Sequence, residues 1–227
     1  MFSTLSGWMS SPMQTLRELA FSLPAVLIGI TVHEWAHARA ALWAGDPTAR
    51  DMGRLSLNPL DHLDLTGFLC LLLLGFGWAK PVPVNTRNFK KFKRDDLIVS
   101  LAGICTNLIT AFVFTLLTFG IAALSPAAAQ SSVYFTVMVS IITVNLSLAV
   151  FNIIPIYPLD GSRILENLIM RKAPKVCFFL RKYGRLIMIG CLFFGLFGAI
   201  LSPAVNFLWG LFYRVGMKEY ALLSGLL

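Results

Sequence analysis

The sequence predicts an all-α membrane protein, a polytopic bundle of about four to six transmembrane helices. Of its residues 57% are hydrophobic and 13% are charged, about half the charged share of an ordinary soluble domain, and the mean hydropathy is +0.74. The 227 residues leave room for one compact bundle. We therefore expect a single integral membrane domain over residues 1–227, with a core at about 21–170 and C-terminal helices at about 184–215.

Apolar runs define the expected helices in chain order. They lie at about 21–44, 66–78, 97–124, 133–154, 186–201 and 204–213. A full crossing needs roughly 20 residues, so the second and the last runs are too short to span comfortably. The second run is predicted to form a short re-entrant or interfacial element, followed by extended chain.

The basic residues predict how the helices are oriented. Six Lys and Arg residues lie in the loop 79–96, seven lie between residues 163 and 185, and the connector 125–132, "SPAAAQSS", has no charge. The positive-inside pattern places both basic segments on the cytoplasmic side of the inner (plasma) membrane and the connector outside. The helices at 21–44 and 133–154 then run parallel, with 97–124 antiparallel between them. The two parallel helices of this three-helix core would both place residues in the cytoplasmic half of the membrane.

The net charge of +8 does not indicate nucleic-acid binding. No basic stripe interleaved with aromatic residues accompanies it, and the cations gather in loops beside apolar runs. The lipid bilayer is the expected partner of these loops.

The stretch "HEWAH" places His33, Glu34 and His37 inside the first apolar run. Residues four apart share one face of a helix, so both imidazoles can converge on one zinc ion, and Glu34 can act as a base toward water. A carboxylate near the bilayer centre costs about 2.5 to 3.5 kcal/mol and is usually functional. The plainer alternative is that Glu34 pairs with a cation and that both histidines bond backbone or hydroxyl groups.

A catalytic zinc site needs three protein ligands and one open position. The third ligand is either His62 or a distant carboxylate, of which Asp160 in "FNIIPIYPLDGSRIL" is the best placed. Pro155 and Pro158 end the preceding helix, so Asp160 would lie at the cytoplasmic end of the third core helix. The alternative for Asp160 is an N-cap of the helix that follows.

The segments "HEWAH", "GWAKPVPVN" and "NIIPIYPLDG", in this order over about residues 23–170, resemble the three signature regions of the site-2 protease family of intramembrane zinc metalloproteases. The compact prokaryotic type without PDZ or CBS domains is the nearest likeness. The resemblance implies Zn²⁺ held by His33, His37 and Asp160, Glu34 as catalytic base, and Asn152 near the substrate carbonyl or the oxyanion. It implies hydrolysis of peptide bonds in transmembrane segments of membrane-protein substrates.

The segment "PVPVN" is the candidate substrate-binding element, comprising Pro81, Val82, Pro83, Val84 and Asn85. Residues before a proline are pushed away from helical conformation, so this segment is expected to be extended. Its edge could pair with an unwound substrate by strand addition. The alternative is a merely rigid cytoplasmic loop.

A different class of function is a metal-ion or proton transporter, since intramembrane His, Glu and Asp also mark ion pathways. A transporter is expected to show paired broken helices in a repeat. The sequence has one polar cluster and no repeat. One departure from the family pattern is Ile104, which stands where proline commonly follows Ala-Gly.

Overall fold

The computed structural model describes residues 7–75 and 77–225, so the outermost ends of the predicted 1–227 domain lie outside the described residues. Its helices are α2 (Pro12–Ala44), α3 (Thr48–Asp51), α4 (Pro59–His62), α5 (Leu65–Leu74), η1 (Thr86–Asn88), α6 (Phe92–Leu124), α7 (Pro126–Gln130), α8 (Ser132–Asn152), α9 (Asp160–Ile169), α10 (Pro174–Phe193) and α11 (Leu196–Leu223). Four of them, α2, α6, α8 and α11, are long and apolar enough to cross a membrane. The predicted all-α, multi-pass architecture is confirmed.

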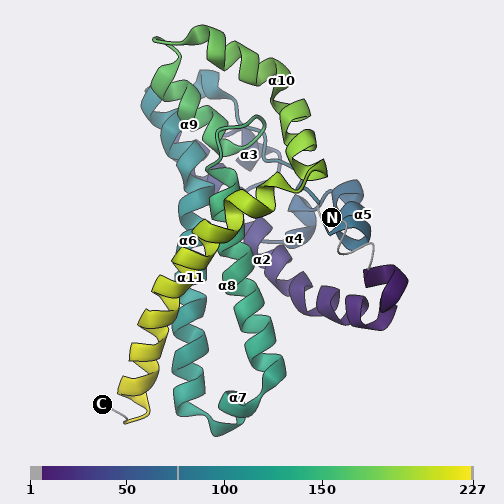
Figure 1. Cartoon of the computed structure of the whole chain (residues 1–227). Coiled ribbons are helices and arrows are strands. Elements are labelled where there is room, and N and C mark those ends of the chain that lie inside the picture. Colours follow the sequence, from purple (N-terminus) through teal and green to yellow (C-terminus); the bar gives the residue numbers. More distant parts are fainter. Residues whose placement is uncertain (1–6, 76, 226–227) are drawn as a thin grey trace.

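Helices α2, α6 and α8 pack against one another and form the predicted three-helix core. In α2 and α6, His37 contacts Val99 and Gly29 contacts Asn107, so the two helices are antiparallel. The short α7 returns the chain from α6 into α8, which runs back alongside it (Figure 1). Helices α2 and α8 are therefore parallel, as predicted.

Helix α11 covers one side of this core by packing on α6 and α8. Ala111, Ile142, Leu146 and Val205 form a buried cluster shared by the three helices. Since lipid tails are as apolar as these side chains, close packing and interhelical hydrogen bonds must hold such helices together. The buried Asn145 supplies one of these hydrogen bonds, because its side-chain oxygen accepts from an amide of α6.

The chain around α5 leaves and returns on one side of the bundle. Leu63 pairs with Ala79 in an isolated antiparallel bridge. A Cβ on Gly67 would lie 2.2 Å from the carbonyl oxygen of Trp78, so the outgoing and returning backbones touch. Helix α5 has ten residues, too few for a crossing. The predicted short element at 66–78 is confirmed as non-crossing, although residue 76 lies outside the described residues.

The predicted division of the C-terminal part into runs at 186–201 and 204–213 is wrong. The break falls at Gly195, whose φ of 68° is readily accessible only to glycine. Pro203 lies inside α11 instead of ending a helix, because a transmembrane helix tolerates the loss of one backbone hydrogen bond. The C-terminal helices consequently extend from residue 174 to 223 rather than from about 184 to 215.

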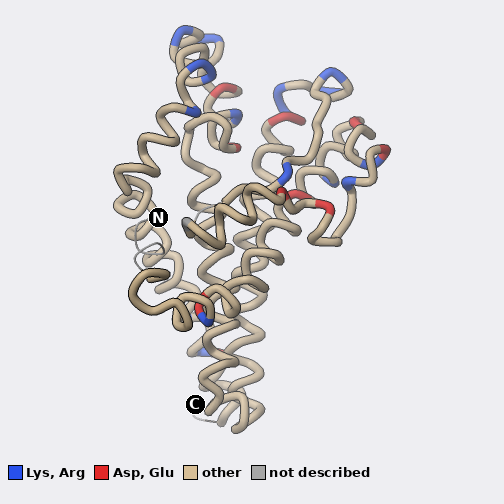
Figure 2. The backbone as a smooth tube through the Cα atoms, turned by 90° about the vertical axis from the view of Figure 1, so that its right-hand side faces the viewer, with Lys and Arg blue, Asp and Glu red and all other residues tan. Residues whose placement is uncertain are grey.

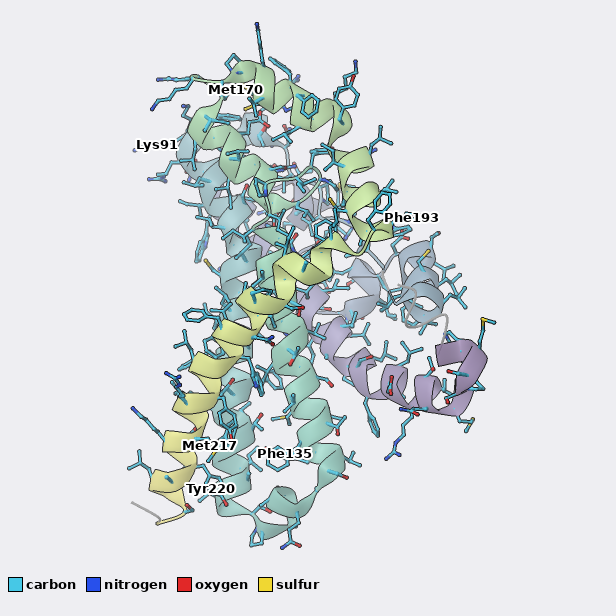
Figure 3. The ribbon with its side chains drawn as sticks, in the orientation of Figure 1. Lys91, Phe135, Met170, Phe193, Met217 and Tyr220 are labelled. Carbon is cyan, nitrogen blue, oxygen red and sulfur yellow. The ribbon has the colours of Figure 1, made fainter. Side chains whose placement is uncertain are left out.

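Charged residues gather at one end of the molecule. Figure 2 shows most Lys, Arg, Asp and Glu residues at the end away from α7 and the C-terminus. Figure 3 places Lys91 and Met170 at this end, and Phe135 and Tyr220 near the other. The two basic segments of the sequence therefore lie together in space.

Candidate metal centre

Three side chains from two distant segments converge at the charged half of the core. His33 and His37 lie one turn apart on α2, and their Nε2 atoms are 3.0 Å apart. Oδ2 of Asp160, the first residue of α9, lies 3.3 Å from His33 Nε2 and 3.2 Å from His37 Nε2. Both histidines are buried. The structure thus brings together the three residues predicted as ligands.

Hydrogen bonds to the other ring nitrogens orient both imidazoles. Nδ1 of His37 lies 2.8 Å from the backbone oxygen of Val99, and Nδ1 of His33 lies 2.6 Å from Oδ1 of Asn107. Asn107 is oriented in turn, because its amide nitrogen donates to the carbonyl of Gly29. Both Nδ1 atoms face oxygens that only accept, so we assign the hydrogen to Nδ1 and a lone pair to Nε2 in each neutral ring.

This donor set fits zinc. Asp160 Oδ2 is buried and has no hydrogen-bond partner in the described part of the chain. Three lone-pair atoms facing one another repel unless a cation lies between them. Tetrahedral ligands about 2.0 Å from zinc are about 3.3 Å apart, close to the separations of 3.0, 3.2 and 3.3 Å between these three atoms. Metal-ligating histidines also commonly donate their second nitrogen to an oxygen, as both do here.

Gly103 of α6 makes room for the imidazoles. A Cβ at this position would lie 2.5 Å from Cε1 of His33 and 2.6 Å from Nε2 of His37, closer than any ordinary contact. Val99, Gly103 and Asn107 follow one another at intervals of four residues and therefore share one face of α6. One face of α6 thus forms a wall of the site, and it orients His37 through the backbone oxygen of Val99 and His33 through the side chain of Asn107, on either side of Gly103.

Asp160 is positioned by the close contact of α9 with the end of α8. A Cβ on Gly161 would lie 2.2 Å from the carbonyl oxygen of Ile153, so only glycine permits this approach. The N-cap of α9 is Leu159, and Asp160 is the first helical residue. The alternative in which Asp160 caps the helix is therefore wrong, and its carboxylate faces the imidazoles instead.

A cavity of about 170 Å³ opens beside the three converging atoms. Glu34 lines it, and its Oε2 accepts the N–H of Val82 at 2.8 Å. Asn152, at the end of α8, also lines it and donates one amide hydrogen to the carbonyl of Leu148 at 3.0 Å. Of the predicted substrate-binding residues, Pro81, Val82 and Val84 line the cavity, whereas Pro83 and Asn85 do not.

Asp46, just beyond the end of α2, fastens the segment 81–85 over the site. Its carboxylate accepts the N–H of Asn85 at 2.7 Å and the side-chain amide of Asn88 at 2.8 Å. Burial alone would raise the pKa of Asp46, but hydrogen bonds from Thr48, Asn88 and Asn85 together outweigh burial and hold the pKa below its ordinary value of 3.8. The carboxylate is therefore ionised at neutral pH, and the segment is tied to the helix that carries both histidines.

His62 contacts the chain at the other end of the segment 81–85 and does not belong to the group formed by His33, His37 and Asp160. Its backbone oxygen accepts the N–H of Lys80 at 2.9 Å, and its Nε2 lies 2.8 Å from the carbonyl of Ser56. Arg54 donates to the carbonyl of Lys80 at 2.7 Å. The two hydrogen bonds of the Lys80 backbone, to His62 and from Arg54, anchor the chain just before Pro81.

Four residues that position the site were not predicted from the sequence. They are Val99, Gly103 and Asn107 of α6 and Asp46, none of which is among the candidate site residues of the sequence analysis. The available signal for Val99, Gly103 and Asn107 was their spacing at intervals of four residues, which places them on one face of a helix. No pattern in the sequence linked Asp46 to Asn85, because the two residues lie in separate loops.

Comparison with known proteins gives two matches. Residues 118–194 match the family described as "Peptidase family M50". The chain is 38% identical over 186 residues to the protein named "Putative zinc metalloprotease YwhC" from Bacillus subtilis (strain 168), and the match covers 80% of this chain and 84% of that protein. No solved structure matches significantly. Identity at this level over most of both chains shows common descent, and with the zinc-compatible cluster it identifies the chain as a zinc metalloprotease that belongs to peptidase family M50, the site-2 proteases.

Proposed function

We propose that this protein hydrolyses peptide bonds within transmembrane segments of membrane-protein substrates. The observation that carries the proposal is the convergence of His33, His37 and Asp160 beside Glu34, in a cavity between helices apolar enough to cross a membrane. The positive-inside pattern supports an active site open to the cytoplasmic side of the inner (plasma) membrane, because both basic segments lie at the same end of the molecule (Figure 2).

Zinc would be held by Nε2 of His33, Nε2 of His37 and Oδ2 of Asp160. When bound, zinc lowers the pKa of a water molecule toward 7 and polarises the scissile carbonyl. The protein fixes the two imidazoles through Val99 and Asn107, so the ligand atoms are held in place before a substrate arrives.

Glu34 would act as the general base and later as the acid. Its carboxylate takes the proton from the attacking water and passes it to the leaving amine. Asn152 retains a second amide hydrogen after its bond to Leu148, and this hydrogen can be donated to the carbonyl oxygen as negative charge develops. Both side chains line the same cavity, which supports these roles.

A transmembrane substrate must unwind before it can be cut, because the carbonyls of a helix are already hydrogen-bonded. The N–H of Val84 has no hydrogen-bond partner among the described residues. An extended substrate could add to this edge of the segment 81–85, which is anchored at both ends. The contact of Val82 with Glu34 would then hold the substrate edge in register with the base.

No observation favours the transporter alternative. The chain belongs to a peptidase family, and the convergence of one carboxylate and two imidazoles is that of a hydrolytic zinc site.

The Glu34→Gln variant separates metal binding from hydrolysis. It should keep zinc near one per chain, while cleavage of test transmembrane substrates in detergent falls by a factor of about 10² to 10⁴. His33→Ala and Asp160→Ala should lose most of the zinc, and His62→Ala should retain it. Undiminished cleavage by Glu34→Gln would rule out Glu34 as the base, and full zinc in Asp160→Ala would rule out that ligand.

A further inference from the structure

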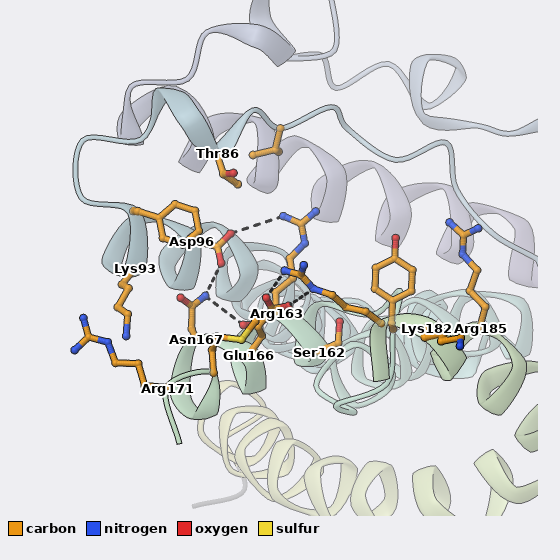
Figure 4. A pocket seen from close by; sticks show the side chains of 15 residues that line it. Thr86, Lys93, Asp96, Ser162, Arg163, Glu166, Asn167, Arg171, Lys182 and Arg185 are labelled. Carbon is orange, nitrogen blue, oxygen red and sulfur yellow. Dashed lines mark hydrogen bonds and ion pairs between the residues drawn. The ribbon is translucent and has the colours of Figure 1, made fainter. Parts of the chain in front are cut away.

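A second, larger cavity lies beside the catalytic one. It has a volume of about 900 Å³ and is formed by η1, the start of α6, α9 and α10 (Figure 4). Two acidic residues, Asp96 and Glu166, line it. Six basic residues also line it: Lys93, Arg163, Arg171, Arg181, Lys182 and Arg185. We call it the basic cavity.

The acidic residues of the basic cavity are already paired. Glu166 binds Arg181 through both carboxylate oxygens, one of them at 3.0 Å from Nε. Asp96 accepts a hydrogen bond from Asn167, and Nη1 of Arg163 lies 3.8 Å from its other oxygen. The remaining four basic residues have no acidic partner among the described residues: Lys93, Arg171, Lys182 and Arg185.

These four cations are exposed and line the cavity at its two ends. Lys93 and Arg171 lie at one end, and Lys182 and Arg185 lie at the other (Figure 4). A concave site with an excess of one sign of charge concentrates the electrostatic field and attracts the opposite charge. The basic cavity therefore favours an extended ligand that carries several negative charges over one small anion.

The basic cavity continues the catalytic cavity. Val84 and Arg163 line both of them, and Thr86 lines only the basic one. A chain laid along the edge at residues 82–84 therefore passes from the catalytic cavity directly into the basic cavity. The part of a substrate that reaches it is the flank beyond the cleaved segment, on the charged side of the molecule (Figure 2).

We propose that the basic cavity selects substrates whose cytoplasmic flank carries Asp and Glu side chains next to the transmembrane segment. This inference rests on the proposed function. Most membrane proteins carry Lys and Arg on this flank, so the cavity repels the majority of transmembrane segments and accepts a minority. Specificity obtained in this way depends on unfavourable contacts with the wrong partner as much as on favourable contacts with the right one.

The binding experiment uses the full chain in zwitterionic detergent and two labelled ten-residue peptides, one with four acidic residues and one with four basic residues. The acidic peptide should bind at least about fivefold more tightly at low salt, and the difference should shrink at 0.5 M NaCl. The double variant Lys93→Gln/Lys182→Gln should weaken the preference, because it removes two of the four basic residues that have no acidic partner. Lys172→Gln/Lys175→Gln removes the same charge from exposed positions outside the cavity and should preserve it.

The cleavage experiment uses one transmembrane segment with an acidic, a neutral or a basic cytoplasmic flank. In zwitterionic lipid, kcat/KM should fall in that order for the wild type, and Lys93→Glu/Lys182→Glu, which leaves as many acidic as basic residues in the lining, should bring the three values together. If the wild-type protein cleaved all three substrates with equal kcat/KM, the inference would be overturned and the proposed function would stand. If kcat/KM depended on the presence of anionic lipid and not on the charge of the flank, the inference would also be overturned, because the cavity would then bind lipid headgroups. If nothing were cleaved while the acidic peptide still bound the cavity, the proposed function would fail and the preference for acidic segments would stand.

Discussion

Replacing Gly103 by alanine tests how the site is built. The new Cβ would lie 2.5 Å from Cε1 of His33 and 2.6 Å from Nε2 of His37, whereas non-bonded carbon atoms ordinarily lie about 3.5 to 4.0 Å apart. The rings must therefore move by about 1 Å. Overpacking of this kind costs about 1 to 3 kcal/mol of stability, but alanine favours a helix over glycine by about 1 kcal/mol, so α6 should still form.

The displaced rings lose their hydrogen bonds to Val99 and Asn107, and loss of such supporting contacts typically lowers metal affinity about 10- to 100-fold. Competition with a fluorescent zinc indicator measures this directly. The matched control is Gly210→Ala in α11, where an added Cβ meets nothing within 4 Å, and its zinc affinity should equal that of the wild type. A Gly103→Ala protein with unchanged zinc affinity would refute the argument that α6 makes room for the imidazoles and orients them.

Three further perturbations follow from the same geometry. Asp46→Ala should cost about 1 to 3 kcal/mol at pH 7, because Thr48, Asn85 and Asn88 lose hydrogen bonds to a buried, charged acceptor. Since the folded pKa of Asp46 lies below 3.8, its contribution is present above that value and lost as the pH falls further, so unfolding free energies of variant and wild type should converge in acid. Gly161→Ala should displace Asp160 and lower the zinc content measured by metal analysis, and an unchanged content would contradict the packing argument. In a cysteine-free background, Lys91→Cys should label from the cytoplasm and Ala129→Cys from outside, and the reverse pattern would overturn the orientation.

The sequence alone predicted the membrane bundle and the relative directions of its core helices. Long apolar runs and clustered Lys and Arg are local properties that depend on the solvent around each segment. The spacing of His33 and His37 likewise needs only the period of a helix. Asp160 was weighed as a ligand because helix direction follows from loop charge, but its competing role as an N-cap stayed open until the structure showed where α9 begins.

Tertiary structure decided everything that depends on contact between segments far apart in the chain. The room left by Gly103, the bond of Glu34 to Val82 and the tether of Asp46 to Asn85 arise from packing of separate segments. The break at Gly195, where the sequence suggested one at Pro203, shows that a local signal can be outweighed when the rest of a helix is satisfied. The basic cavity likewise depends on contact between segments far apart in the chain. Its cations are scattered over about 90 residues of sequence, where each is only a solubilising or orienting charge. Folding brings four elements together around one space, and only there do the unpaired charges act on the same ligand.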